Sequence, residues 1–223
     1  MKEIKTITNE KELIDLFNFL SETFYDDAKA HHEHYYPMTE RLEEMKTQLN
    51  KDNELILYIE DKGKIIAGLT SKNMSKDKIT IGVMAVDKNY QRQGYAKTLI
   101  QEFEKRCKEK GIYKIDLGAR FRACPLYLSQ NYIPSLMVQV YDFATIEDIK
   151  KENIYNLKIK NSYQTQAFGF VIFEIDQIKE EYINHFETNV KTANAQYIFE
   201  KNVKENTNAK IWKRNKNTKY WHY

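Results

Sequence analysis

Cysteine is scarce in this sequence of 223 residues and occurs only as Cys107 and Cys124. Neither lies in a CxxC or Cys/His spacing, so the sequence predicts neither a metal site nor a disulfide framework. Two lone thiols in a chain of this length favour a reducing compartment. The segment Met1–Lys5 is charged and alternating rather than an apolar signal region. We therefore expect a cytoplasmic protein.

Long hydrophobic runs are also missing. Phe168–Phe173 is typical of the longest apolar stretches, whereas a membrane-spanning helix needs about 20 apolar residues. Charged residues make up 30% of the chain, but their signs nearly cancel and leave a formal net charge of +3. This balance argues against a dedicated nucleic-acid binder. The apolar content of 42% is sufficient for a folded core.

The spacing of apolar residues predicts an α/β protein with a mixed sheet. An amphipathic helix begins at Asn9, a β-hairpin is expected at residues 55–69, and a long strand is expected at residues 79–86. The order then becomes helix, strand, helix, strand, with the helices beginning near Gly94 and Cys124. Such alternation is typical of α/β proteins.

The pattern changes after residue 143. We therefore expect a first domain at residues 1–144 and a small α+β C-terminal extension at residues 145–223. Within the extension we expect a helix, two strands and a second helix, at residues 146–151, 155–160, 167–175 and 177–186. The apolar strands after residue 154 could form the surface of a homodimer.

The most informative segment follows the strand that ends at Val86. Gln91–Ala96 reads QRQGYA, with Gly94 at the start of a helix. A glycine in this place leaves backbone N–H groups unpaired at the positive end of the helix dipole. Such groups bind a pyrophosphate, which the missing side chain allows to approach. An isolated glycine is nevertheless more often only a tight turn, and the further glycines of a dinucleotide fingerprint are missing.

A second segment, Ala123–Tyr132, reads ACPLYLSQNY and follows the first after one helix and one strand. It is similar to the pattern Ala-x-x-Leu-Tyr-x-x-x-Gly-Phe, while Gln91, Gly94 and Ala96 fit the pattern Gln/Arg-x-x-Gly-x-Gly/Ala. Together the two segments resemble the GNAT superfamily of acetyl-CoA-dependent N-acetyltransferases. The resemblance covers roughly residues 1–143.

The resemblance implies a GNAT-like splayed central sheet flanked by helices. It also implies an enzyme that takes acetyl-CoA as co-substrate and transfers the acetyl group directly to an amine. In such enzymes the strand before the loop hydrogen-bonds the pantetheine arm, a role that falls here to the backbone of Met84 and Val86. The pyrophosphate is expected on the N–H groups of Arg92, Gln93, Gly94, Tyr95 and Ala96.

The resemblance also implies roles in the reaction. The Met84 N–H, or one beside it, would stabilise the oxyanion, and Tyr127 would protonate the departing thiolate. The alternative for Tyr127 is a ring that only packs on the cofactor arm. Arg120 stands where the family often has an asparagine that holds CoA, and an arginine there could meet a phosphate. Asn131 replaces the glycine at the helix end and tolerates the same left-handed conformation.

The segment between the first two helices carries His31, His32, His34 and Tyr35. By analogy with the family, this segment lines the acceptor side, so we expect these residues to contact the substrate. The alternative is a solvated polar loop. Consecutive histidines point in different directions, which argues against a metal site.

Several positions leave the function open. No general base stands out, and Asp116 is a weak candidate. Cys124 is more simply a packing residue than an acyl carrier. The basic, aromatic end of the chain, which includes Trp212 and Trp221, could bind RNA. The rival functions are a non-catalytic CoA-binding or partner-binding module, and an acetyltransferase whose tail docks an RNA or ribosomal acceptor. The sequence does not identify the acceptor amine.

Overall fold

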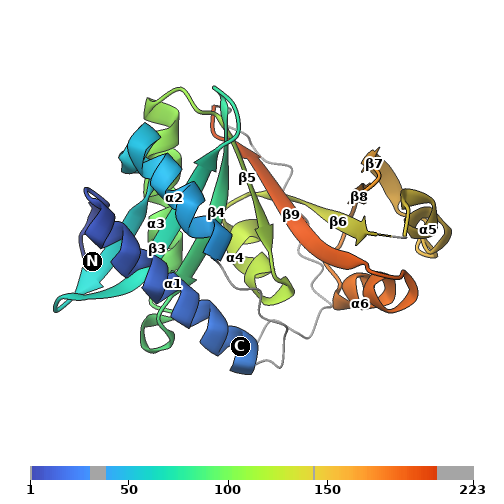
Figure 1. Ribbon diagram of the computed structural model, residues 1–223, viewed down its shortest axis with the longest axis horizontal. Coiled ribbons are helices and arrows are strands. Elements are labelled where there is room, and N and C mark those ends of the chain that lie inside the picture. The colour runs from blue at the N-terminus through green and yellow to red at the C-terminus, as the bar shows by residue number, and fades with distance from the viewer. Residues whose placement is uncertain (1, 31–38, 143, 205–223) are drawn as a thin grey trace.

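The structure is a computed structural model that describes residues 2–30, 39–142 and 144–204 (Figure 1). Within these ranges the chain forms one nine-stranded sheet with helices on its faces. The strands are β1 (Ile4–Thr6), β2 (Leu57–Asp61), β3 (Lys64–Asn73), β4 (Lys78–Val86), β5 (Lys114–Ala119), β6 (Ile133–Tyr141), β7 (Lys158–Gln164), β8 (Phe168–Glu174) and β9 (Asn194–Asn202). The α-helices are α1 (Glu10–Ala30), α2 (Thr39–Asp52), α3 (Tyr95–Glu109), α4 (Cys124–Ser129), α5 (Ile146–Lys151) and α6 (Glu180–Asn189). Three 3₁₀ turns are η1 (Asn53–Leu55), η2 (Lys88–Tyr90) and η3 (Phe121–Ala123).

The strands follow the order β1-β2-β3-β4-β5-β9-β6-β8-β7 across the sheet. All neighbouring pairs are antiparallel except β4 and β5, which are parallel. The mixed sheet flanked by helices that the sequence predicts is therefore confirmed. The parallel pair lies where one helix, α3, connects two neighbouring strands, because a parallel connection needs a crossover.

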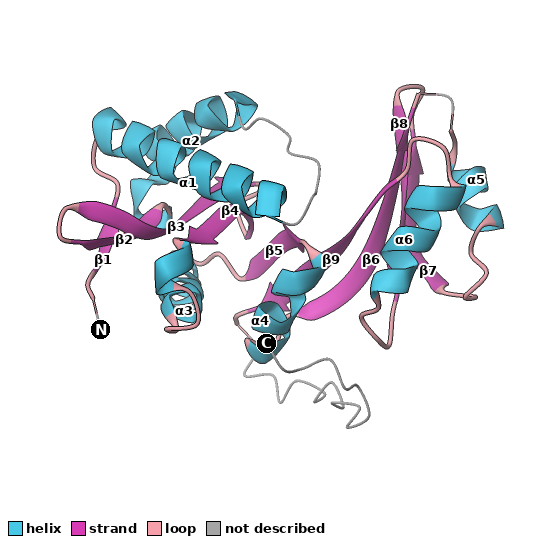
Figure 2. Cartoon of the chain, turned by 90° about the horizontal axis from the view of Figure 1, so that it is seen from below, coloured by secondary structure: helices cyan, strands magenta, loops and turns pink. Residues whose placement is uncertain are grey.

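Two apolar clusters cover opposite faces of β2–β4. Leu16 and Leu20 of α1 are fully buried and belong to one cluster together with Val83 of β4. Ile100 and Phe103 of α3 belong to the other. Figure 2 shows α1 and α2 on one side of these strands and α3 on the other. Burial of these apolar side chains removes them from water and so holds the helices on the sheet.

The C-terminal part of the chain shares the same sheet. β9 lies between β5 and β6, so that Leu117 pairs with Phe199 and Leu136 pairs with Tyr197. Figure 2 shows β6, β8 and β7 extending away from β1–β4, with α5 and α6 beside them. The boundary expected at residue 144 therefore does not coincide with a break in the sheet. None of the helices in the described ranges combines the length and apolarity that crossing a membrane requires.

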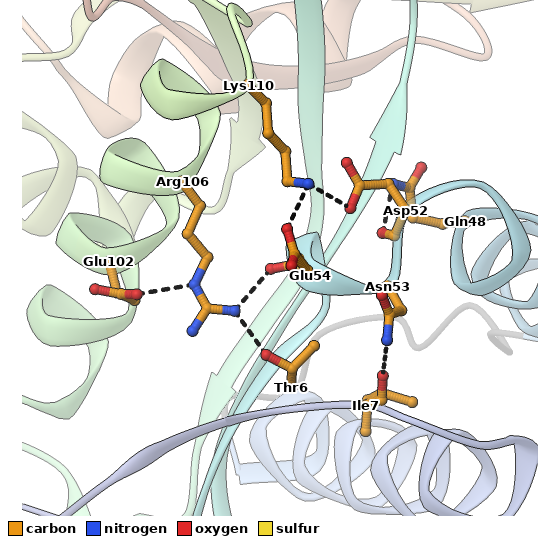
Figure 3. Close-up of polar contacts among 9 residues, drawn as sticks. All are labelled: Thr6, Ile7, Gln48, Asp52, Asn53, Glu54, Glu102, Arg106 and Lys110. Carbon is orange, nitrogen blue, oxygen red and sulfur yellow. Dashed lines mark hydrogen bonds and ion pairs between the residues drawn. The ribbon is translucent and has the colours of Figure 1, made fainter.

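The last turns of α3 are braced against the segments before β2 (Figure 3). Arg106 donates from Nη1 to Thr6 Oγ1 at 2.6 Å and to the carbonyl oxygen of Glu54 at 2.9 Å. Its Nε pairs with Glu102 at 2.8 Å, and Lys110 pairs with Glu54 at 2.5 Å. These contacts fix the C-terminal end of α3, whose N-terminal end forms part of the candidate site.

Candidate active site

The candidate site begins where β4 and β5 separate. The two strands pair only from Lys78–Ile81 to Lys114–Leu117. Beyond this stretch, and within the described ranges, residues 82–86 of β4 have no partner on the β5 side, while Gly118 and Ala119 of β5 pair only with β9. We call the space between these diverging segments the opening. It is the splayed arrangement that the resemblance led us to expect.

A bulge in β4 lies at the start of the opening. Leu69 pairs with Met84, whereas Ser71 pairs with Ile81, so β4 has one residue more than β3 in this stretch. A bulge of this kind reverses the alternation of side chains along a strand. Ile81 accordingly packs in the cluster of α3, while Val83 packs in the cluster of α1.

The backbone groups of Met84 and Val86 face the opening. Asp87 donates its N–H to the carbonyl oxygen of Ile66 in β3 at 2.8 Å. Because N–H directions alternate along a strand, the N–H of Ala85 also points to β3, and those of Met84 and Val86 point away from it. The Val86 carbonyl oxygen accepts a hydrogen bond from Gln91 Nε2 at 3.2 Å.

The loop after β4 has two residues in the left-handed region. Arg92 has φ 61° and Gly94 has φ 88°. A Cβ built on Gly94 would meet no atom within 4 Å, so the backbone angle rather than crowding within the protein favours glycine here. Gln91, Arg92, Gln93 and Gly94 are all exposed.

The first turn of α3 has N–H groups that meet no acceptor in the part of the chain that the structure describes. Gly94 is the N-cap residue and has no side chain to cap the helix. The first bond into the helix runs from the Thr98 N–H to the Gly94 carbonyl oxygen at 3.0 Å. The N–H groups of Tyr95, Ala96 and Lys97 precede it and meet no acceptor within the described ranges. They create a positive helix end that attracts an anion.

Side-chain hydrogen bonds and an ion pair hold the first residues of the loop in place. Asp87 Oδ1 accepts the Asn89 N–H at 2.9 Å, and this bond is the main reason that the pKa of Asp87 lies below its usual range. The Tyr90 hydroxyl donates to Asp61 Oδ2 at 2.9 Å, and Lys2 pairs with the same carboxylate at 2.5 Å. The sequence analysis did not identify Asp61 or Tyr90. The contact of Asp87 could have been found, because an aspartate before a turn commonly accepts a backbone N–H.

Tyr127 lies on α4, in the core on the α3 side of the sheet. The residue is 6% exposed, and its ring contacts those of Tyr132 and Phe199 at centroid distances of 5.9 Å and 5.4 Å. Burial raises the pKa of its hydroxyl well above the usual range of tyrosine. No hydrogen bond within the described ranges uses this hydroxyl, so it is available as a donor.

Two other candidates, Asp116 and Cys124, make structural contacts. Asp116 pairs with Lys78 at 2.6 Å and accepts a hydrogen bond from Thr80, where β4 and β5 are still paired. Cys124 is 1% exposed, and its thiol donates to the Arg120 carbonyl oxygen at 3.5 Å. Burial raises the pKa of this thiol to about 12, which disfavours the reactive thiolate.

Arg120, which the resemblance places at the cofactor, lies against α1. Its Nη1 pairs with Asp27 Oδ2 at 2.9 Å, and its guanidinium lies 5.5 Å from the centre of the Phe24 ring. Arg122 Nη2 donates to the same oxygen of Asp27. These contacts join the last turns of α1 to the segment that follows β5.

The comparison with protein families settles what kind of domain this is. The model of the Acetyltransferase (GNAT) family matches residues 13–132, which is more than half of the chain. The chain belongs to the GNAT acetyltransferase family. The match contains the opening, the loop after β4 and Tyr127.

Solved structures of several GNAT acetyltransferases are similar to this one. A putative acetyltransferase from Pyrococcus horikoshii has a TM-score of 0.54 at 12% identity, covering 90% of this chain and 89% of that chain. The ribosomal-protein-S18-alanine N-acetyltransferase from Escherichia coli has a TM-score of 0.47 at 18% identity, covering 81% and 97%. GCN5 from Tetrahymena has a TM-score of 0.42 at 19% identity, covering 78% and 96%. The first superposition shows a shared fold.

The GNAT fold brings most of the residues chosen from the sequence to one place. Met84 and Val86 line the opening, and Gln91–Ala96 follow β4 after Asp87 and η2. Arg120 is on the α1 side. His31, His32, His34 and Tyr35 lie outside the described residues.

Proposed function

We propose that this GNAT acetyltransferase transfers the acetyl group of acetyl-CoA directly to an amine, with the cofactor arm held in the opening. The observation that carries the proposal is the pair of backbone groups at Met84 and Val86. They face a space in which, among the residues that the structure describes, β4 has no neighbouring strand, so an extended amide-containing chain can pair with them as a strand would. Membership of the GNAT family supports the pantetheine arm of acetyl-CoA as this extended ligand.

The loop after β4 suits the diphosphate of the same cofactor. The N–H groups of Tyr95 and Ala96 have no acceptor within the described ranges, and they lie at the positive end of α3. The left-handed residues Arg92 and Gly94 turn the preceding backbone. Successive N–H groups of such a turn form a concave anion site.

The reaction needs three events that these residues can serve. The neutral nitrogen of the acceptor attacks the thioester carbon, so that a C–N bond forms and the carbonyl oxygen becomes an oxyanion near the Met84 N–H. The C–S bond then breaks. The Tyr127 hydroxyl gives its proton to the sulfur and later regains one from water, and the nitrogen releases a proton to water. The raised pKa of Tyr127 keeps its hydroxyl protonated at neutral pH.

A thiol-release assay tests the proposal. Purified protein is incubated with acetyl-CoA and a panel of amines, and free CoA thiol is measured together with the mass of each product. Replacing Tyr127 by phenylalanine should preserve CoA binding and lower kcat by about 10² or more, the usual size of a general-acid contribution. Tyr163→Phe is the matched control, because Tyr163 is half exposed on β7.

The rival is a module that binds CoA without catalysis. It predicts a measurable CoA affinity but no thiol release with any amine, and no difference between the wild-type protein and Tyr127→Phe. Thiol release that depends on both an amine and Tyr127 excludes it.

A further inference from the structure

A cluster of two arginines and one aspartate spans the opening on its α1 side. Phe24 and Asp27 lie three residues apart and share a face of α1 near its end. Arg120 follows the last residue of β5, and Arg122 belongs to η3. Both guanidinium groups meet at Oδ2 of Asp27. The cluster thus joins the helix above β4 to the segment after β5.

This position is on the acceptor's route in the proposed complex. The side chains of Met84 and Val86 pack toward the cluster that contains α3 and α4, whereas those of Val83 and Ala85 pack toward α1. Figure 2 shows α1 on the other side of the sheet. In the proposed complex the amine approaches the acetyl group from the side on which Asp27, Arg120 and Arg122 meet.

Another carboxylate can take the place of Asp27 in the ion pairs of this cluster. The side chains of Asp27, Arg120 and Arg122 are 35%, 32% and 32% exposed, and ion pairs at such exposure contribute little to stability. α1 does not depend on them, because Leu16 and Leu20 fix it through full burial. Guanidinium groups bind carboxylates through planar, charge-assisted hydrogen bonds. The group that they hold here, Asp27, is itself a carboxylate.

We propose that Arg120 and Arg122 bind a carboxylate of the acceptor, and that Asp27 occupies this place when no acceptor is present. The acceptor would then be an amine that also carries a carboxylate, such as an amino acid. The inference rests on the proposed function, since it takes the acetyl group to lie in the opening. It assigns Arg120 to the acceptor rather than to a phosphate of the cofactor.

Matched amines test this proposal. Lysine and 1,5-diaminopentane differ by one carboxylate, and so do alanine and ethylamine. For each pair, KM and kcat are measured by thiol release at saturating acetyl-CoA. Binding of each amine to CoA-loaded protein is measured by calorimetry, which does not need turnover. We expect the member with the carboxylate to have a KM or Kd lower by about tenfold, the effect of one charge-assisted contact.

Two substitutions should move this preference in opposite directions. Arg122→Gln removes a guanidinium. Within each pair, the KM or Kd of the amine without the carboxylate, divided by that of the amine with it, should fall toward one. Asp27→Asn removes the competing carboxylate and should increase the ratio. If the cluster had only a structural role, both substitutions would change this ratio in the same direction. Arg106→Gln, which breaks the brace of Figure 3, is the control and should leave the ratio unchanged.

The results separate this proposal from the proposed function. Transfer to amines with no preference for a carboxylate, or a preference that Arg122→Gln leaves intact, would overturn the proposal alone. Failure of every amine to release thiol would contradict the proposed function. In that case, binding of lysine that depends on Arg122 still supports the carboxylate site, and the absence of such binding overturns it.

Discussion

The hydroxyl oxygen of Thr70 accepts the N–H of Val83 at 3.1 Å, at the point where β4 separates from β5. Thr70 is only 3% exposed, so no bulk water can replace this bond. The extra residue in β4 would otherwise leave the Val83 N–H without a partner in the ladder with β3. One side chain of β3 thus supports the bulge that turns Met84 and Val86 toward the opening.

Replacing Thr70 by valine should destabilise the protein. Valine has nearly the same shape but leaves the buried Val83 N–H unpaired, which costs about 1–3 kcal/mol. Urea unfolding measures the change. Thr47→Val is the control, because Thr47 is exposed on α2 and its hydroxyl donates to the Glu43 carbonyl oxygen of its own helix. Equal unfolding free energies for both variants would show that Thr70 does not support the bulge.

Replacing Gly94 by alanine should weaken CoA binding. The left-handed φ of 88° costs a residue with a Cβ about 1 kcal/mol, and the added methyl group would lie where the diphosphate is expected. Gly111→Ala is a matched control, since Gly111 has φ 74° and equally open surroundings at the other end of α3. Both variants should lose similar stability, but only Gly94→Ala should raise the Kd for CoA. A similar rise in both would remove the loop from the cofactor site.

Replacing Tyr90 by phenylalanine should loosen the loop without removing any group that touches the cofactor. The variant loses the hydrogen bond from the Tyr90 hydroxyl to Asp61. Loss of this hydrogen bond to a carboxylate should appear as a Kd for CoA that is raised several-fold. Calorimetry measures it. An unchanged Kd would mean that the loop keeps its conformation without this contact.

The pH dependence of the reaction should reflect the buried state of Tyr127. An ordinary tyrosine hydroxyl loses its proton near pH 10, whereas burial raises the pKa of Tyr127 well beyond that value. The acid form therefore persists, and kcat should not fall between pH 8 and pH 10 through loss of this proton. A decline in kcat over this range that is absent from Tyr127→Phe would contradict the assignment.

Both cysteines should resist alkylation in the folded protein. Cys107 and Cys124 are at most 1% exposed, and burial raises the pKa of each thiol to about 12. At pH 8 almost no thiolate is present, and the reagent has no access. Mass spectrometry should find no label after treatment with iodoacetamide, and two labels after unfolding in urea. Rapid labelling of Cys124 in the folded state would restore it as a candidate acyl carrier.

Local patterns in the sequence were sufficient for most elements of the fold. The strand expected at residues 79–86 is β4, and the helix expected at residues 146–151 is α5, with the same bounds. Side-chain periodicity specifies such elements because burial on one face repeats along the chain. The position of β9 between β5 and β6 was not predicted. It depends on pairing between strands that are far apart in sequence, which no local pattern encodes.

In the candidate site, too, local features were predicted and contacts between distant residues were not. The loop at Gln91–Ala96 was found because its chemistry lies in consecutive residues. The contact of Asp27 with Arg120, and that of Asp61 with Tyr90, join residues in separate parts of the chain. Only the packing of α1 and β2 against the rest of the sheet brings them together.

Amide hydrogen exchange followed by NMR, with and without CoA, tests the central claim most directly. If the cofactor arm pairs with β4 and the diphosphate binds at the start of α3, CoA should slow exchange at Met84, Val86, Tyr95 and Ala96. Amides of β8, remote from the opening, should not change. Saturation with CoA that leaves the exchange of Met84 and Val86 as fast as in the free protein would contradict the account.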